Sequence, residues 1–149
     1  MLAGPPEAWC WQILRKLQWS AGVFCPRCGG KARRHYRRRY GSYYWCRGCH
    51  RMFSDLTATL FEQTRAPLSA WFVAISLLSP DSEEVPTCFE LARILRVDFH
   101  TAYRIRIRLL AVQEDPLICS IRTDMFLWKV KNQVRKENHS SCTFGSILQ

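Results

Sequence analysis

The chain has 149 residues, 48% of them hydrophobic and 23% charged, with a formal net charge of +10 and a pI of about 9.6. This composition excludes an intrinsically disordered chain, and the length excludes one large enzyme core, which leaves one ordinary domain or two small ones. So large an excess of positive charge favours a partner made of phosphate.

The first predicted element is a helix over residues 7–17, which follows a Pro-Pro pair. One face of this helix would carry the apolar side chains of Cys10, Ile13, Leu14 and Leu17. We assign residues 1–22 to an N-terminal helix. They lack the basic and apolar regions of a secretory signal, so we expect a cytoplasmic protein associated with the nucleoid.

A β pattern follows in residues 23–62. Aromatic and β-branched residues, a turn signal at Gly41-Ser42 and a second apolar run from Leu56 to Phe61 predict two or three antiparallel strands. Residues 31–51 hold eight lysines and arginines and no acid. Such a run is commonly a solvated surface, but aromatic residues are interleaved with it, which favours nucleic-acid contact. The arginines expected to make that contact are Arg33, Arg34, Arg37, Arg38 and Arg39.

Two Cys-x-x-Cys pairs flank this basic segment. Cys25 and Cys28 are followed, after seventeen residues, by Cys46 and Cys49, a spacing typical of a zinc site. Each pair would present two thiolates from a tight turn, and two such turns complete a tetrahedron around one Zn²⁺. Four protein ligands close the site, so we expect one structural zinc ion as the cofactor.

Other interpretations of the thiols are weaker. Residues 46–50 also spell C-x-x-C-H, the attachment sequence of c-type haem, but that chemistry belongs to exported proteins and leaves the first pair unexplained. A redox pair would need a βαβ pattern, which is not visible. His50 could replace one cysteine as a ligand, although four thiolates make this unnecessary. The cysteines without metal-ligand spacing, expected to be incidental thiols, are Cys10, Cys88, Cys119 and Cys142.

The second half of the chain is predicted to be helical. Pro67 ends the β pattern, and the run from Leu68 to Ser79 is too short to cross a membrane, so we expect a buried core helix. Its apolar stripe would consist of Trp71, Phe72, Ile75 and Leu78. Two short helices follow, over residues 88–95 and 99–112, and Asp115-Pro116 ends the second.

These two short helices match the apolar template of a helix-turn-helix. Asp98 would cap the second helix, whereas Arg96 stands at a turn position that usually holds glycine, at a cost on the order of 1 kcal/mol. The residues expected to meet DNA from the second helix are Phe99, His100, Thr101, Tyr103, Arg104 and Arg108. Helical hairpins also occur in cores that bind nothing, so packing or dimerisation is the alternative.

Beyond Pro116 the apolar pattern weakens. Residues 125–137 could form a basic amphipathic helix, but the last ~12 residues are small and polar. We therefore expect residues 116–149 to be a divergent and partly disordered tail.

The chain resembles the amino-terminal part of a bacterial DDE-type insertion-sequence transposase of the zinc-ribbon group. Four segments carry the resemblance: CPRCGG, YWCRGCHRMFSDLTATLF, TRAPLSAWFVAISLLS and LARILRVDFHTAYRIRIRL. It runs from about Glu7 to Leu110 and implies a small α+β fold. A rubredoxin-like zinc ribbon over residues 23–62 would precede a helical region with the helix-turn-helix over residues 63–115, and both would bind the terminal repeats of the element.

The resembled family places an RNase H-like catalytic domain next. Only about 39 residues follow Leu110, whereas such a domain needs at least ~100. We therefore expect the chain to be truncated before the catalytic domain, by a frameshift or an early stop, and not to be an enzyme.

The leading hypothesis is a zinc-stabilised DNA-binding protein that binds transposon ends without catalysing transposition. One alternative is a subunit of a split transposase, active only with a separate catalytic chain. Another is a zinc-ribbon module that binds protein or RNA. The expected partners are double-stranded DNA and either a second copy or a full-length transposase, with no membrane and no small-molecule substrate.

Overall fold

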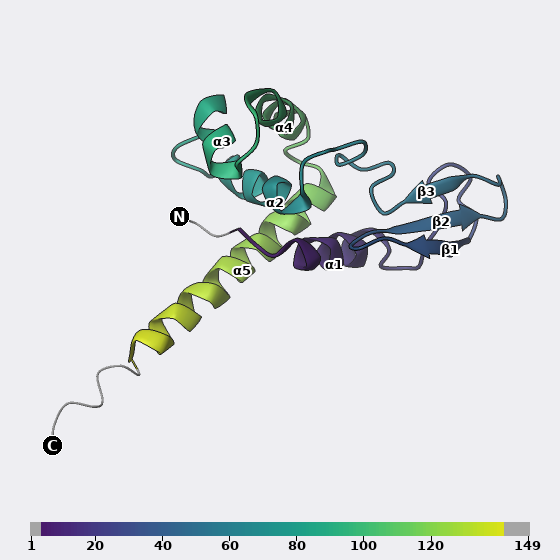
Figure 1. The fold of residues 1–149 in the computed structure, drawn as a ribbon, viewed down its shortest axis with the longest axis horizontal. Helices are drawn as coiled ribbons and strands as arrows, with labels where there is room; N and C mark the ends of the chain where they lie inside the picture. The colour runs from purple at the N-terminus through teal and green to yellow at the C-terminus, as the bar shows by residue number, and fades with distance from the viewer. Residues whose placement is uncertain (1–3, 142–149) are drawn as a thin grey trace, which may run out of the picture.

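The structure is a computed structural model that describes residues 4–141. Its elements are α1 (Glu7–Gln18), β1 (Ala32–Arg37), β2 (Ser42–Cys46), β3 (Met52–Ser54), α2 (Leu68–Leu77), α3 (Cys88–Leu95), α4 (Phe99–Ala111) and α5 (Pro116–Ser141). The sheet lies at one end, away from α2, α3 and α4, and the second half of α5 projects from the body (Figure 1). This arrangement confirms the predicted small α+β fold class.

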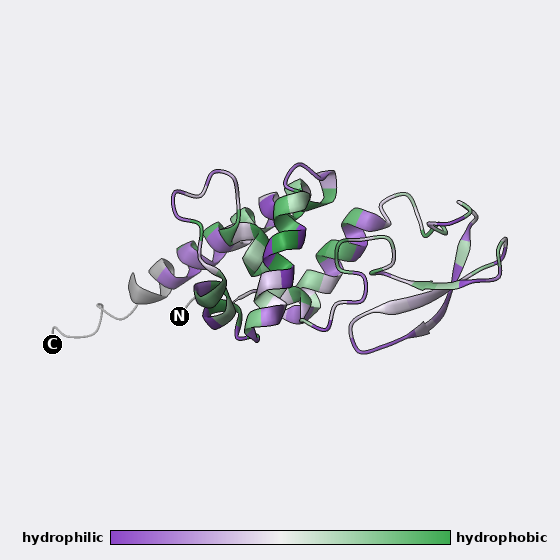
Figure 2. Cartoon of the chain, turned by 90° about the horizontal axis from the view of Figure 1, so that it is seen from above, coloured by the Kyte–Doolittle hydropathy of each residue, from purple (hydrophilic) through white to green (hydrophobic). Residues whose placement is uncertain are grey.

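One hydrophobic core joins α1 to the helices that follow the sheet. Its buried side chains include Leu14 from α1, Trp71 from α2, Ile105 from α4 and Ile121 from α5. Hydrophobic residues gather where these helices meet, whereas hydrophilic residues colour β1 (Figure 2). Because α2 is apolar around most of its circumference, it packs at the centre of the bundle. None of the helices in residues 4–141 is long and apolar enough to span a bilayer.

Glu7 ties the opening helix to this core. Its carboxylate accepts hydrogen bonds from the backbone N–H groups of Leu68 (2.9 Å) and Ser69 (2.8 Å), at the start of α2. The first N–H groups of a helix have no partner inside it, and an anion there also suits the helix dipole. The preceding Pro67 supplies no side-chain cap, so Glu7 performs this role from 61 residues away.

The α3–α4 hairpin forms where the sequence predicts it. Thr87 and Glu90 form a reciprocal capping box at the start of α3. Asp98 accepts a hydrogen bond from the backbone N–H of Thr101 at 2.9 Å and caps α4. Arg96 adopts the left-handed conformation between the helices, with φ 55° and ψ 43°, as its place in the template requires.

The three strands form an antiparallel sheet in the order β1-β2-β3. The expectation of β structure from Leu56 to Phe61 is wrong, because backbone hydrogen bonds such as Thr59 N–H to the Leu56 carbonyl close a series of turns there. The Thr59 hydroxyl also donates to the Leu56 carbonyl at 2.6 Å, and such local bonds compete with a strand ladder. These turns carry Phe61 into the helical core, where it is fully buried.

The helix α5 occupies most of the segment that was predicted to be a divergent, partly disordered tail. Pro116 occupies its first position and Asp115 accepts hydrogen bonds from the next N–H groups, so the start of α5 is capped. Ile118, Ile121 and Met125 are spaced to share one face and are buried in the core. Other apolar residues of α5 lie on the opposite, exposed side, which blurs the helical periodicity in the sequence. The predicted fraying of the last residues, and Cys142, lie outside the described part of the chain.

Candidate metal centre and nucleic-acid surface

Two turns of the same design carry the four cysteines. In the first, the N–H of Gly29 donates to the carbonyl of Cys25 at 2.9 Å, and in the second, the N–H of His50 donates to the carbonyl of Cys46 at 3.1 Å. Gly29 and His50 therefore hold equivalent positions, and both have positive φ, 72° and 55°. The repeated backbone geometry makes each Cys-x-x-Cys pair present its sulfurs on one side of its turn.

The four sulfur atoms of Cys25, Cys28, Cys46 and Cys49, the four-cysteine cluster, lie within 4.8 Å of one another. The Sγ atoms of Cys25 and Cys49 are 3.6 Å apart, and those of Cys28 and Cys46 are 3.3 Å apart. A tetrahedral site with Zn–S bonds of ~2.3 Å has S···S edges of about 3.8 Å, so the cluster could hold one metal ion, with zinc the best fit to four thiolates.

Glycines leave room for the sulfurs. A Cβ atom at Gly30 or at Gly48 would lie 3.3 Å from the Sγ of Cys28, closer than most side-chain carbons approach another atom. Gly29 instead supplies the positive φ that the first turn needs. The three glycines are therefore part of the site.

Backbone N–H groups of the same turns favour the thiolate form of two of the four cysteines. The backbone N–H of Cys49 lowers the pKa of the Cys46 thiol to about 6, and the backbone N–H of Cys28 lowers the pKa of Cys25. Burial raises the pKa of Cys49 to about 11. A cation would supply the charge that lets all four ionise together, which is the form that binds zinc.

Asp55 anchors the sheet to α1. It is fully buried and accepts four hydrogen bonds from residues far from it in sequence. The donors are Tyr44 Oη at 2.7 Å, Ser42 N at 2.8 Å, Trp19 Nε1 at 2.9 Å and Arg15 Nη2 at 3.4 Å. Burial and the bond to Asp55 raise the pKa of Tyr44 to about 12, so this hydroxyl remains a donor. The carboxylate therefore fixes how the sheet sits against the helix.

Sequence reasoning did not find Asp55 or the capping role of Glu7. Asp55 is a lone acid in an ordinary turn sequence, and its donors lie 11 to 40 residues away. The capping box at Thr87 and Glu90 was also missed, although its Thr-x-x-Glu pattern is a recognised helix-start signal.

The predicted arginines cover the β1–β2 hairpin. All five are exposed: Arg33, Arg34 and Arg37 on β1, and Arg38 and Arg39 in the turn before β2. β1 is also an edge strand of the sheet. Beside α1, a hollow of about 480 Å³ is lined in part by Arg15, Arg34 and Arg37. Arg15 is paired with Asp55, so Arg34 and Arg37 supply the unpaired positive charge of this lining.

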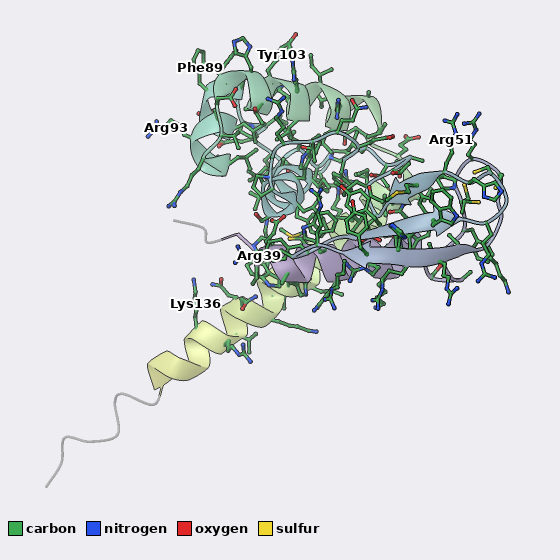
Figure 3. The ribbon with its side chains drawn as sticks, turned by 45° about the vertical axis from the view of Figure 1, so that its right-hand side comes forward. Arg39, Arg51, Phe89, Arg93, Tyr103 and Lys136 are labelled. Atoms are coloured by element: carbon green, nitrogen blue, oxygen red, sulfur yellow. The ribbon has the colours of Figure 1, made fainter. Side chains whose placement is uncertain are left out.

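The predicted residues of α4 lie on a separate surface. Phe99, His100, Tyr103 and Arg104 are exposed, and Thr101 is half-buried because it supports the Asp98 cap. The ring of Phe89 in α3 lies 4.7 Å from that of Phe99, a neighbour that sequence reasoning did not single out. Phe89 and Tyr103 point outward from this end of the molecule, apart from Arg51 of the sheet segment (Figure 3).

Two arginines of α4 make contacts within the protein. Arg108 donates to the carbonyl oxygens of Leu60 and Glu62, each at 3.4 Å, and so links α4 to the turns that follow β3. Arg106 donates to the carbonyl of Pro86. Arg104 makes neither contact, and its side chain is exposed.

The fold and cluster define a small α+β protein with a four-cysteine cluster that could hold one metal ion. Among curated proteins it is similar to an uncharacterized protein in transposable element ISH50 of Halobacterium salinarum, with 38% identity over 68 residues. The match covers 42% of this chain and 22% of the length of that relative, so the homology is distant and partial. No protein-family model matches the chain, and no solved structure matches it.

Proposed function

We propose that the chain is a zinc-stabilised DNA-binding protein of a mobile element, which binds transposon ends without catalysing transposition itself. The observation that carries the proposal is the arginine-rich hairpin closed by the four-cysteine cluster. Cys28 lies just before β1 and Cys46 ends β2, so a bound metal would hold both ends of the hairpin. The partial similarity to a protein in a transposable element supports the association with mobile elements.

Electrostatics favour duplex phosphate as the partner of this hairpin. Residues 31–51 contain no acid, and the nearby Asp55 is buried and engaged with four donors. The arginines therefore present uncompensated positive charge, which draws polyanions and releases their counterions. Contacts of this kind give affinity that does not depend on sequence.

We assign recognition of the DNA base sequence to α4. Its exposed face near the N-terminal end combines His100 and Arg104 with aromatic rings, and recognition helices place this end in the major groove. An arginine there can bind guanine through two hydrogen bonds, and apolar groups can contact thymine methyls. The two surfaces would act together, one for affinity and one for selectivity.

A selection from a random duplex library, carried out with zinc-loaded protein, tests the proposal. The selected duplex is then compared with a scrambled duplex of equal length at about 50 and about 200 mM salt. We expect selective binding that persists at the higher salt, with affinity for both duplexes falling steeply. Failure to enrich any sequence would exclude the reading role of α4.

Matched variants separate the two surfaces. Arg37→Gln with Arg38→Gln should weaken binding to both duplexes alike and reduce the salt slope by roughly one for each phosphate that is no longer neutralised. Arg104→Ala should instead cost about 1–3 kcal/mol on the selected duplex only. Arg135→Ala, an exposed arginine on the projecting half of α5, is the control and should change neither. Equal effects of all three variants per positive charge removed would mean that only net charge matters.

A further inference from the structure

A bulge in β1 creates an aromatic surface that the sequence does not reveal. The pairing of β1 with β2 shifts between Arg34 and Tyr36, so His35 is an extra residue in the ladder. Without this shift, Arg34 and Tyr36 would lie on the same face, because alternate residues of a strand do. With it, Arg34 stays opposite the buried Tyr44, and Tyr36 moves to the other face, opposite Tyr43.

The outer sheet face is the side of the sheet turned away from its buried cysteines. Arg33, Trp45 and Met52 form one row across the three strands, since residues directly opposite one another share a face. Tyr36 and Tyr43 stand in the next row. We use the name outer sheet face for these five residues: Arg33, Tyr36, Tyr43, Trp45 and Met52.

The rings on this face are ordered and partly open to solvent. Tyr36 and Tyr43 stack with centroids 4.6 Å apart and planes 10° from parallel, and the Arg38 guanidinium lies 5.2 Å from the Tyr43 ring centre. Tyr36 is 39% exposed and Trp45 is 37% exposed. An aromatic ring held on a strand with a free surface can stack a nucleic-acid base with little further loss of conformational entropy.

The charge around these rings indicates which class of partner binds to the outer sheet face. Arg33 lies directly opposite Trp45, and no acid occurs in residues 31–51. A protein partner would also find apolar contact here, but this many arginines without an acid favours a polyanion. A base must be unpaired to stack on a side chain, because a duplex covers the faces of its bases.

We propose that the outer sheet face binds unpaired bases of single-stranded DNA, with Tyr36 and Trp45 as stacking platforms and the flanking arginines on the phosphates. DNA is assigned as the strand type because the proposed function concerns a DNA element. The inference extends that function to a second form of DNA, and it depends on the sheet being folded but not on duplex reading by α4. Opened strands at the ends of a mobile element are the chemical class of ligand that fits.

The first experiment measures binding of fluorescently labelled oligo-dT of about 12 nucleotides to zinc-loaded protein. Tyr36→Ala and Trp45→Ala should each weaken binding by roughly 5- to 150-fold, the range for loss of one base–aromatic stack. Phe89→Ala removes an exposed aromatic ring from the helical end and should leave oligo-dT binding unchanged. Unchanged binding by both sheet variants would overturn the proposal.

The conservative variant Trp45→Phe distinguishes loss of the stacking ring from unfolding of the sheet. Trp45→Phe keeps a ring on the strand, so it should retain most of the affinity while losing the share of tryptophan quenching that the stacked indole produces. Zinc content and far-UV circular dichroism of every variant show whether the sheet is intact. Full quenching in Trp45→Phe would place the base elsewhere and contradict the assignment.

Two further binding experiments distinguish DNA from RNA and the sheet surface from α4. Oligo-rU of equal length should bind no more tightly than oligo-dT, and clearly tighter binding of RNA would overturn the DNA assignment. Arg104→Ala should leave oligo-dT binding intact even if it abolishes duplex preference. If the protein binds oligo-dT but prefers no duplex sequence, only the recognition role of α4 is rejected. If it prefers a duplex sequence but does not bind oligo-dT, only the stacking surface is rejected.

Discussion

Trp19 donates its indole N–H to Asp55 across 2.9 Å, and this hydrogen bond joins the end of α1 to the turn after β3. The same indole ring packs against Tyr44 and Phe53, with centroids 5.8 and 5.9 Å away, so it closes the small core of the sheet. One residue thus contributes a polar and an apolar contact to the junction. The junction decides how the basic hairpin is presented relative to the helices.

Asp55→Ala is expected to destabilise the protein by about 3 kcal/mol or more, because it leaves several buried donors without a partner. Trp19→Phe removes a single donor and keeps most of the ring packing, so it should cost about 1–2 kcal/mol. Urea unfolding of the zinc-loaded variants measures both values. Equal stability of Asp55→Ala and the parent protein would show that the carboxylate does not anchor the sheet.

Removal of the metal should unfold the sheet and spare the helices. The core of the sheet, with Tyr44, Cys46 and Phe53, is separate from the helical core. Metal binding supplies folding free energy to sites as small as this one. A chelator should therefore abolish the dispersed NMR resonances of residues 32–54 and leave most of the helical circular dichroism.

The matched variants for the metal site are Cys46→Ser and Cys119→Ser. Cys46 is a buried member of the four-cysteine cluster, so its substitution should lower the zinc content well below one ion per chain. Cys119 is exposed and lies outside the cluster, and its substitution should have no effect. A full zinc content in Cys46→Ser would mean that another side chain completes the site.

Ile121 and Phe126 test whether α5 belongs to the core. Ile121 is fully buried, and its truncation to alanine should cost about 2–5 kcal/mol because it leaves a cavity. Phe126, five residues later, is 65% exposed, and its truncation should change stability by less than about 0.5 kcal/mol. Thermal or urea unfolding gives both numbers. Similarly small effects of the two substitutions would mean that the first half of α5 does not pack into the helical core.

The α3–α4 hairpin should lose stability in acid. Hydrogen bonds from Thr101 lower the pKa of Asp98 below its ordinary 3.8, and hydrogen bonds from Thr87 lower the pKa of Glu90 below 4.5. A carboxyl group with a lowered folded pKa stabilises the fold above its unfolded pKa, and this contribution disappears as the pH falls through the folded value. We expect constant cap stability down to about pH 4.5 and a decline below it.

The amide resonances of Glu90 and Thr101, followed against pH, report these caps without interference from zinc release at the sheet. In Asp98→Ala, the Thr101 amide should lose the low-pH transition, and α4 should fray at its start even at neutral pH. A transition that survives in this variant would have to be assigned to another group.

Local features account for what could be predicted. The Cys-x-x-Cys spacing predicted the four-cysteine cluster because each turn is built from consecutive residues. The bounds of α3 and α4 followed from apolar periodicity and from Asp98, which acts within three residues of its partner. The DNA contacts of Arg33 to Arg39 and of α4 stay predictions, although the structure shows most of those side chains to be exposed.

The amino-acid sequence by itself determined the two cysteine turns, the strands and the helical hairpin, since each depends on residues that are close along the chain. The excess of positive charge follows from composition alone. Only the tertiary structure decided that Asp55 anchors the sheet, that the first half of α5 completes the helical core, and that a one-residue bulge at His35 brings Tyr36 beside Tyr43. These features join residues distant in sequence, or depend on strand register, and a pattern of adjacent residues does not encode which distant groups will meet.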